Sequence, residues 1–206
     1  MKLLIIGPPA SGKGTQAERI ADKFKLEHIS TGDIFRKMDD EEISQYLASG
    51  KLLPDELVFR AVKEKIDRKE NFILDGYPRN VNQAKMLDSF LEEKGSEIDY
   101  VIYLKVSDET IIKRMTSRRT CKECGKTYNI ITSPPPEDNK CECGGELIQR
   151  DDDKEEVVRD RLRIFRKVTQ PVIDHYINKL IVVDGELSIN DVFNSIYKRL
   201  KEEKEN

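Results

Sequence analysis

Short apolar runs alternate along this chain with longer segments in which apolar residues recur every three or four positions. The runs have the length of strands, are apolar on both faces, and cover residues 3–6, 72–74, 100–104 and 180–183. Such runs are typical of a parallel sheet that helices cover on both sides. The pattern therefore predicts a doubly wound α/β fold.

The segments between these runs have helical spacing. One helix is predicted after Pro54, with Asp55 as its N-cap, and another is predicted with Ser107 as its N-cap. Residues 154–179 read as one or two helices interrupted near Pro171, and the polar residues after 200 are expected to fray. The apolar positions that we expect in the core are Val58, Val62, Ile66, Ile111, Met115, Val192, Ile196 and Leu200.

Two segments interrupt the alternation. Residues 30–53 are short, polar and expected to be helical, and residues 116–153 carry all four cysteines, three consecutive prolines and a Gly-Gly pair. We expect the second segment to be a small independent module. The remaining residues, 1–29, 54–115 and 154–206, are expected to form the core domain.

Composition narrows the functional classes. The 206 residues are 37% hydrophobic, which is enough for the core of one α/β domain with small insertions. The net charge of −3 argues against a general nucleic-acid-binding protein, which usually carries a basic excess. No run approaches the roughly 20 apolar residues of a membrane span, so we expect a cytoplasmic protein without membrane contact.

Residues 7–15, GPPASGKGT, follow the first predicted strand and precede a helix. A glycine-rich turn in this context directs several backbone N–H groups at one point, and Lys13 can reach the outer phosphates of a nucleotide. The general P-loop pattern has Ser or Thr directly after the lysine, whereas Gly14 intervenes here before Thr15. The GKGT form is typical of nucleoside monophosphate kinases. An incidental glycine-rich turn is the competing interpretation.

Further motifs make the resemblance specific. They are ISTGDIFR (29–36), LDGYPRNVNQA (74–84), IIKRMTSRR (111–119), QRDDD (149–153) and VVRDRL (157–162). Together with the glycine-rich loop, and in this order, they make the chain resemble the adenylate kinase family over nearly its whole length. The resemblance implies a P-loop NTPase-type five-stranded sheet, an NMP-binding insert at 30–53 and a lid at 116–153. It also implies reversible, Mg²⁺-dependent transfer between ATP and AMP that yields two ADP, with lid closure excluding water.

The resemblance implies a role for each matching residue. ATP would be bound by Ala10, Ser11, Gly12, Lys13, Gly14, Thr15, Arg114, Arg118, Thr127, Tyr128 and Leu187. AMP would be bound by Thr31, Arg36, Lys51, Leu52, Leu53, Gly76, Tyr77, Pro78, Arg79, Gln83, Arg150 and Arg161. The catalytic cations would be Lys13, Arg79, Arg118, Arg150 and Arg161. Asp75 would hold Mg²⁺ through water, while Asp152 and Asp153 are either hinge or arginine-orienting residues, or a solvated run of charge.

The arginines also have an independent rationale. Phosphoryl transfer needs positioned phosphates and neutralised charge more than covalent help from the protein, and planar guanidinium groups bind phosphate oxygens in pairs. Any one of these arginines alone is more often part of a surface salt bridge. For the whole set, that explanation is poor.

The acceptor is expected to be AMP. In this family a threonine at position 31 suits adenine, and the amide of Gln83 can bond the adenine edge at two points. A UMP or CMP kinase on the same scaffold is the alternative. Two departures from the family pattern are Tyr77, where many members have Phe, and a segment between Arg36 and Lys51 that is several residues shorter than usual.

The cysteines occur as Cys121-x2-Cys124 and Cys141-x1-Cys143, a plausible four-sulfur zinc site. The second pair lacks one residue of the usual knuckle, and the glycines after it could relieve the strain. A three-sulfur site and metal-free thiols are the alternatives. Four thiolates leave no open position on the metal, so this Zn²⁺ would be structural.

Three expectations remain. His28 and His175 have no metal or nucleophile partner in the sequence and are expected to be structural. A non-enzymatic zinc-ribbon module that binds nucleic acid or protein would explain the cysteines, but it leaves the glycine-rich loop and the arginines unexplained. The family resemblance favours a monomer and leaves a homo-oligomer open.

Overall fold

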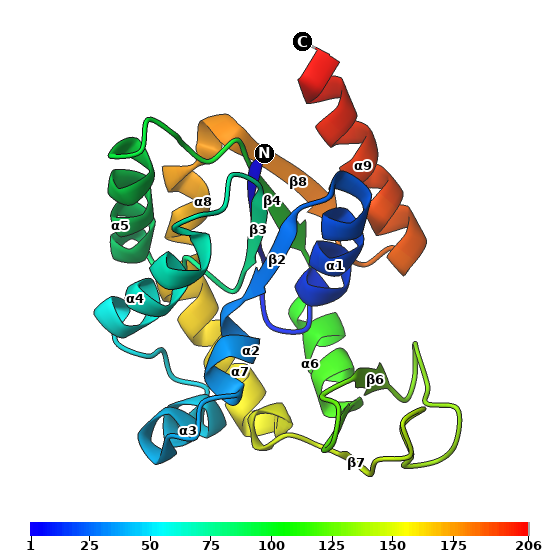
Figure 1. The fold of residues 1–206 in the computed structure, drawn as a ribbon. Coiled ribbons are helices and arrows are strands. Elements are labelled where there is room, and N and C mark those ends of the chain that lie inside the picture. Colours follow the sequence, from blue (N-terminus) through cyan, green and yellow to red (C-terminus); the bar gives the residue numbers. More distant parts are fainter. Residues whose placement is uncertain (206) are drawn as a thin grey trace.

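The computed structural model describes residues 1–205 and is built on a five-stranded parallel sheet in the order β2-β3-β1-β4-β8 (Figure 1). Leu4 in the central strand pairs with Leu74 on one side and Val101 on the other. The strands are β1 (Lys2–Ile6), β2 (Glu27–Ser30), β3 (Phe72–Asp75), β4 (Tyr100–Lys105) and β8 (Leu180–Asp184). The predicted doubly wound α/β fold is confirmed.

The edge strand β2 is the one that the hydrophobic pattern did not predict. It has four residues, of which only Ile29 is buried. An edge strand with a single core residue gives no run of apolar positions, so its pairing with β3 is visible only in three dimensions. The family resemblance, which implied five strands, supplied what the pattern lacked.

Helices cover both faces of the sheet (Figure 1). One face packs against α1 (Lys13–Phe24) and α9 (Ile189–Glu205), and the core there includes Ile20, Val192, Ile196 and Leu200. The larger core on the other face involves α2, α3, α4, α5 and α8. Every apolar position predicted for the core is buried. The remaining helical bounds are α2 (Thr31–Arg36), α3 (Glu41–Ser49), α4 (Asp55–Ile66), α5 (Val81–Glu92), α6 (Asp108–Thr116), α7 (Glu155–Ile164) and α8 (Pro171–His175), with short turns η1 (Asp151–Asp153), η2 (Phe165–Thr169) and η3 (Ile177–Lys179).

Helix boundaries test the predicted caps. The hydroxyl of Ser107 accepts a hydrogen bond from the backbone N–H of Thr110, so this N-cap is confirmed. The prediction for Asp55 is wrong, because Pro54 occupies the N-cap position and the carboxylate of Asp55 accepts hydrogen bonds from side-chain amides of α5 and its cap instead. The interruption near Pro171 is confirmed as a π-helical turn, after which α8 begins at that proline.

The polar residues at the end of the chain were expected to fray after position 200. Instead α9 continues through Glu205. Its interior residues Val192, Ile196 and Leu200 are anchored in the core, and consecutive Lys and Glu residues favour the helix. Within residues 1–205, no helix is long and apolar enough to cross a membrane.

A second, antiparallel sheet lies within the segment predicted to be the lid. It has the order β6-β5-β7, with β5 (Arg118–Cys121), β6 (Thr127–Asn129) and β7 (Leu147–Ile148). Its buried cluster contains only Cys121, Tyr128, Cys141 and Leu147. Such a small apolar cluster gives little burial energy, which suits a module that needs a cross-link or a metal for stability.

Candidate active site

The loop between β1 and α1 forms a cradle of backbone N–H groups. Ala10 (φ 52°) and Gly12 (φ 94°) both adopt left-handed conformations, and Gly12 caps α1 without a side chain over its first N–H groups. A non-glycine residue in this region is strained, and such strain clusters at functional sites. The hydroxyl of Ser11 is buried and has no hydrogen-bond partner among the described residues. Unpaired donors at a helix N-terminus suit an anionic ligand.

Lys13 is the first residue of α1 and bends back over this loop, where its Nζ donates to the carbonyl of Pro8 at 2.8 Å. The pKa of Lys13 is lowered to about 8, chiefly by burial. Asp75 opposes this shift, and the cations Arg79, Arg161 and Arg118 contribute to it. The ammonium of Lys13 is therefore destabilised by its protein surroundings. An anion placed there would relieve it.

The arginines predicted to bind phosphates lie close enough to perturb one another. Burial lowers the pKa of Arg79 to about 10, and Arg161 and Arg36 add to this effect. Burial also lowers the pKa of Arg150 to about 10, with contributions from Arg36 and Arg118. Cations scattered from position 13 to position 161 of the chain thus converge on one region. Their mutual repulsion makes this region a strong attractor of anions.

Two aspartates orient part of this arginine cluster. Asp153 accepts hydrogen bonds from both Nε and Nη2 of Arg118, with the Nε–Oδ2 distance at 3.0 Å. Asp152 pairs with Arg161 through Nη1. Burial opposes ionisation of Asp152, but Arg161 and Arg118 outweigh it and lower the pKa of that carboxyl. These ion pairs fit the arginine-orienting alternative for Asp152 and Asp153, and the burial of both carboxylates contradicts a solvated run of charge there, whereas Asp151 is exposed.

Asp75 ends β3 directly beside the phosphate loop. A Cβ on Gly14 would lie 3.4 Å from its Oδ2, so the loop passes close to this carboxylate. Its other neighbour is His28 on β2, whose Nε2 lies 3.9 Å from Oδ2, too long for a hydrogen bond. Burial disfavours the charged imidazole, but Asp75 outweighs it and raises the pKa of His28. His28 was expected to be structural, and its position beside Asp75 was not foreseen, because the adjacency of β2 and β3 is not encoded locally.

The site has carboxylate and hydroxyl oxygens that suit Mg²⁺. The Asp75 carboxylate and the exposed hydroxyl of Thr15 both flank the phosphate loop. Mg²⁺ prefers such oxygen ligands and usually combines one or two protein groups with water and phosphates. The residues therefore fit Mg²⁺ bound together with a nucleotide.

Residues predicted for the AMP site surround a pocket next to the phosphate loop. Leu52, Gly76, Arg79 and Arg161 line it together with Lys13. A Cβ on Gly50 would lie 2.7 Å from Cγ of Arg161, so the backbone directly after α3 packs tightly against α7. This close packing requires glycine at position 50, where φ is 68°. Two segments far apart in sequence therefore form one wall.

Thr31, the first residue of α2, holds the backbone at Gly76, which lines this pocket. Thr31 is buried, and its hydroxyl donates to the carbonyl of Gly76 at 2.9 Å. Arg79 donates from Nε to the same carbonyl at 2.8 Å. Arg36 does not line this pocket and is paired with Asp33 at 2.7 Å, both side chains being exposed. The other residues predicted to bind AMP differ in exposure: Lys51 is exposed, Leu52 is partly exposed, and Leu53, Tyr77 and Pro78 are buried.

The amide of Gln83 is held in place and only 1% exposed. Its Oε1 accepts from the backbone N–H of Arg79 at 2.8 Å, and its Nε2 donates to Asp55 at 2.8 Å. Each amide atom retains one unused hydrogen-bonding position. Asp55 is a residue that our sequence analysis had assigned to helix capping. No local pattern distinguishes the two roles.

Residues predicted to contact the ATP base come from separate segments. Arg114 on α6 is half-buried, which lowers its pKa, while nearby Glu186 and Asp184 act in the opposite direction. Arg114 therefore lies near Glu186, which directly precedes the exposed Leu187. Thr127 accepts a long hydrogen bond from Arg150, at 3.4 Å. The hydroxyl of Tyr128 instead faces the cysteines, 3.3 Å from the Sγ of Cys141. Its backbone belongs to β6 and pairs with Arg119 of β5.

The four cysteines converge in the small sheet. Their sulfur atoms all lie within 4.8 Å of one another, and several pairs are separated by 3.5 Å. Tetrahedral zinc, with each sulfur at about 2.3 Å, separates its sulfurs by about 3.8 Å. Gly144 takes a left-handed conformation (φ 84°) after the shortened pair, as the strain argument anticipated. Hydrogen bonding from Tyr128 lowers the pKa of Cys141 to about 6 and favours its thiolate. The pKa of Cys143 moves the other way: a backbone hydrogen bond at Gly145 lowers it, but hydrogen bonds with the other three cysteines raise it to about 12. This group could hold a metal ion.

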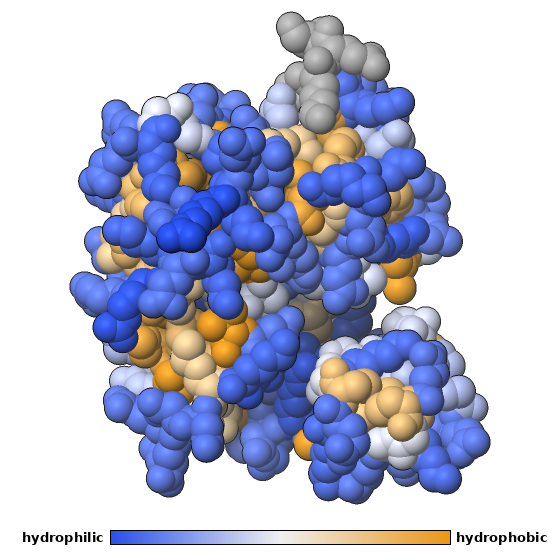
Figure 2. All heavy atoms as spheres, in the orientation of Figure 1, coloured by the Kyte–Doolittle hydropathy of each residue, from blue (hydrophilic) through white to orange (hydrophobic). Residues whose placement is uncertain are grey.

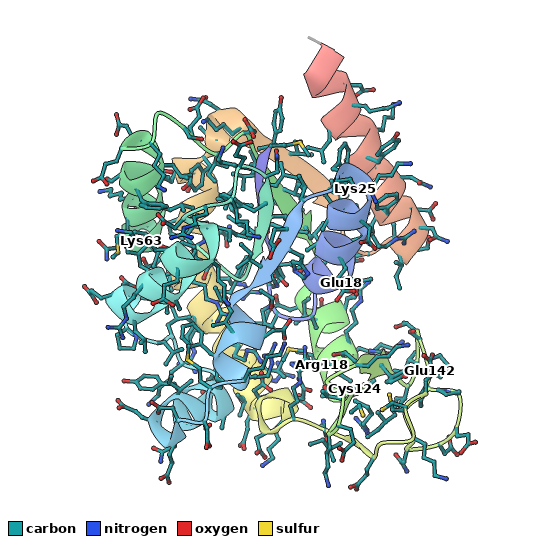
Figure 3. All side chains as sticks on the ribbon, in the orientation of Figure 1. Glu18, Lys25, Lys63, Arg118, Cys124 and Glu142 are labelled. Carbon is teal, nitrogen blue, oxygen red and sulfur yellow. The ribbon has the colours of Figure 1, made fainter. Side chains whose placement is uncertain are left out.

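Part of the predicted site lies where the small lobe, residues 116–153, joins the main body, since Arg118 and Arg150 lie near the two ends of that lobe. Figure 2 shows a furrow that separates the small lobe from the main body on this face. In Figure 3, Arg118 lies where α6 meets the small sheet, whereas Cys124 and Glu142 lie farther out on that lobe. The arginine cluster and the cysteine group are therefore distinct, with the first at the junction and the second within the lobe.

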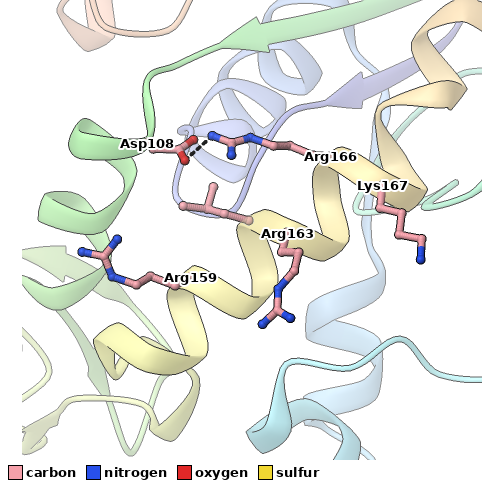
Figure 4. Close-up of a pocket in the computed structure, with 6 residues that line it drawn as sticks. Asp108, Arg159, Arg163, Arg166 and Lys167 are labelled. Carbon is pink, nitrogen blue, oxygen red and sulfur yellow. Dashed lines mark hydrogen bonds and ion pairs between the residues drawn. The ribbon is translucent and has the colours of Figure 1, made fainter.

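A second group of basic residues lies apart from the phosphate-loop pocket. Arg159, Arg163, Arg166 and Lys167 line an open pocket along α7 and η2, where Arg166 pairs with Asp108 (Figure 4). Arg159 and Arg163 also pair with acidic residues of their own helix. Because most of these cations are neutralised locally and exposed, this pocket lacks the concentration of positive charge found around Lys13.

Comparisons with known proteins agree with this geometry. The adenylate kinase family model matches residues 5–181. The chain is 47% identical over 98% of each chain to a protein named adenylate kinase from Petrotoga mobilis. It is 49% identical to the Caldanaerobacter subterraneus protein of that name, over 97% of this chain and 96% of the relative. The corresponding figures for the Archaeoglobus fulgidus adenylate kinase are 47%, 95% and 96%.

A P-loop fold with a phosphate cradle and converging arginines defines a nucleotide phosphotransferase. With a match over most of its length, this chain belongs to the adenylate kinase family.

Proposed function

We propose that this protein transfers the terminal phosphoryl group of ATP reversibly to AMP, giving two molecules of ADP. The observation that carries the proposal is that Arg79, Arg118 and Arg161 lie close enough to Lys13 of the phosphate loop to lower its pKa. Arg150 is in turn close enough to Arg118 to be affected by its charge. Two nucleotides that meet for transfer bring several negative charges together, and these cations would neutralise them. A zinc-ribbon binding module would not need this cluster.

Each group has a defined task in the proposal. The N–H groups of residues 10–15 and the ammonium of Lys13 hold the ATP phosphates. Arg36 and Arg79 hold the phosphate of AMP, while Arg118, Arg150 and Arg161 stabilise the charge on the group in transit. Asp75 holds Mg²⁺ through water, and the ion supplies further charge neutralisation at the phosphates when bound.

The base contacts complete the proposed site. The adenine of AMP lies against Leu52 and Leu53 and is bonded by Gln83, with Thr31 nearby. Arg114, Leu187 and the backbone of residues 127–128 contact the base or ribose of ATP. Lid closure over ATP excludes water, which is a competing phosphoryl acceptor.

Zinc has a structural role in this proposal. Cys121, Cys124, Cys141 and Cys143 bind one Zn²⁺ and thereby stabilise a lobe whose apolar cluster is too small to stabilise it alone. The lobe then positions Arg118 and Arg150, which lie near its two ends in the chain, against the ATP phosphates. The protein is proposed to act as a cytoplasmic monomer.

A coupled assay of ADP formation tests the reaction. Purified protein with MgATP is offered AMP, CMP, UMP or GMP in turn, and kcat/KM is compared. Preferred turnover of AMP supports the proposal. Preferred turnover of UMP or CMP would keep the phosphotransferase mechanism and overturn the assigned acceptor, and no turnover with any monophosphate in folded protein would overturn the reaction itself.

A further inference from the structure

Gln83 is fixed at four points, more than packing of a helix requires. Its backbone N–H donates to Oδ1 of Asn80 at 2.8 Å, and its carbonyl accepts from the hydroxyl of Tyr77 at 2.9 Å. Its side chain bonds the N–H of Arg79 and the carboxylate of Asp55. Both the position of this residue and the direction of its amide are therefore set by neighbours.

The two side-chain partners of Gln83 allow only one orientation of its amide, called its sense below, with Oε1 toward Arg79 and Nε2 toward Asp55. The N–H of Arg79 can only donate, so it must face Oε1. Asp55 as a carboxylate can only accept, so it must face Nε2. Burial raises the pKa of Asp55, but hydrogen bonds from Asn82, Asn80 and Gln83 outweigh this effect and keep it below its usual value. In a reversed amide, Nε2 would face the N–H donor of Arg79 and Oε1 would face the carboxylate acceptor of Asp55, so neither hydrogen bond could form.

We infer that Asp55 is a specificity-determining positioning residue, which selects 6-aminopurine over 6-oxopurine monophosphates by fixing the sense of the Gln83 amide. The unused positions of that amide are one N–H and one oxygen lone pair, in a fixed order. An adenine edge offers an amino donor beside a ring-nitrogen acceptor, whereas a hypoxanthine edge offers an oxygen acceptor beside an N–H donor. In one base pose, only one of these edges is complementary. This inference rests on the proposed binding of AMP.

Asp55 acts through Gln83 rather than on the nucleotide itself. Its Oδ1 is bonded by Asn80 at 2.7 Å as well as by Gln83, and its Oδ2 is bonded by Asn82 at 2.8 Å. Both carboxylate oxygens thus have protein partners. Asn82 is exposed, and its side chain bonds Asp55. Within residues 1–205 it makes no side-chain hydrogen bond to Gln83, so it offers a matched control.

The test is the ratio of kcat/KM for AMP to that for IMP, measured with MgATP as donor. In Asp55→Asn, the new amide can present either an oxygen or an NH₂ group to Gln83, so residue 55 no longer opposes the reversed amide and only the N–H of Arg79 does. A hydrogen bond to a charged group stabilises by about 1.5–3 kcal/mol, which corresponds to about a 10- to 100-fold fall in the AMP/IMP ratio. Asp55→Ser, whose hydroxyl also donates and accepts, should give a fall in the same direction. Asn82→Ala should leave the ratio unchanged.

Melting temperatures identify any variant that fails to fold, in which case the other Asp55 variant decides. An unchanged AMP/IMP ratio in a folded Asp55 variant overturns the inference, even if AMP turnover drops, because a merely structural role would slow both substrates alike. An equal fall of the ratio in Asn82→Ala overturns it too. Failure of the wild-type protein to turn over AMP would instead overturn the proposed function.

Discussion

Asp153 has no solvent exposure, yet its carboxylate receives two hydrogen bonds from the single guanidinium of Arg118. The pair joins the first residue of β5 to η1, which are the two places where the small lobe leaves and rejoins the main body. An arginine held in this way is preorganised along one edge and keeps its remaining N–H groups for a phosphate. The lobe is thereby oriented before any nucleotide binds.

Removal of the Asp153 charge should therefore destabilise the protein. In Asp153→Asn the largely buried Arg118 loses its closest carboxylate and keeps only Asp152, at 3.9 Å. Breaking a buried pair from one side costs about 3 kcal/mol or more. Urea unfolding measures this change as a lower midpoint. The matched control is Asp151→Asn, since Asp151 is exposed and pairs only with Lys154 in the next turn. Equal losses in the two variants would contradict the role assigned to Asp153.

The pKa of Lys13 predicts a pH dependence of ATP binding. Because the folded protein lowers the pKa to about 8, the ammonium is lost as the pH rises above that value. ATP requires the ammonium, so its affinity should fall by up to about tenfold per pH unit above about pH 8, with proton uptake on binding. Calorimetry between about pH 7 and about pH 9 measures both quantities.

Lys13→Arg is the control for this titration, because a guanidinium at position 13 stays charged over the same range. Its affinity for ATP should be flat with pH, and a slope like that of the wild type would refute the assignment. The same group affects stability in the opposite direction. Since its folded pKa is lowered from 10.5, the unfolded chain binds more protons between about pH 8 and pH 10.5, so its contribution to stability rises with pH there.

The cysteine group predicts one Zn²⁺ per chain and a lobe that depends on it. Cys143→Ser should reduce zinc content and lower the melting temperature, because the lobe has little apolar burial of its own. Glu142→Gln, an exposed neighbour between the second pair of cysteines, should retain the metal. Metal analysis of purified protein measures the content. Full zinc retention in Cys143→Ser would indicate a three-sulfur site, and absence of zinc from the wild type would indicate free thiols.

What the sequence could predict followed from short motifs and regular spacing. The apolar runs predicted four strands of the main sheet, and the glycine-rich loop and Arg118 lie where their motifs implied. What it could not predict depends on contacts between distant segments. The four residues of β2 bury one apolar side chain, so no periodicity marks them.

Asp55 gives the clearest example of this limit. Its place after Pro54 is typical of a helix cap, and only the packing of α4 against α5 brings it to Gln83. His28 is similar, because its closeness to Asp75 follows from the pairing of β2 with β3. Local propensity describes each segment separately, whereas these roles arise from tertiary neighbours.

The most direct test of the account compares two arginines on one helix. Arg161 and Arg163 both belong to α7, but the first has 20% side-chain exposure and lines the site, while the second has 76% and lies outside it. With MgATP and AMP, Arg161→Ala should lower kcat/KM by at least about 100-fold, since removal of one transition-state charge contact costs about 3 kcal/mol. Arg163→Ala should stay within about twofold of the wild type. Comparable activity in the two variants would contradict the claim that the converging arginines perform the transfer.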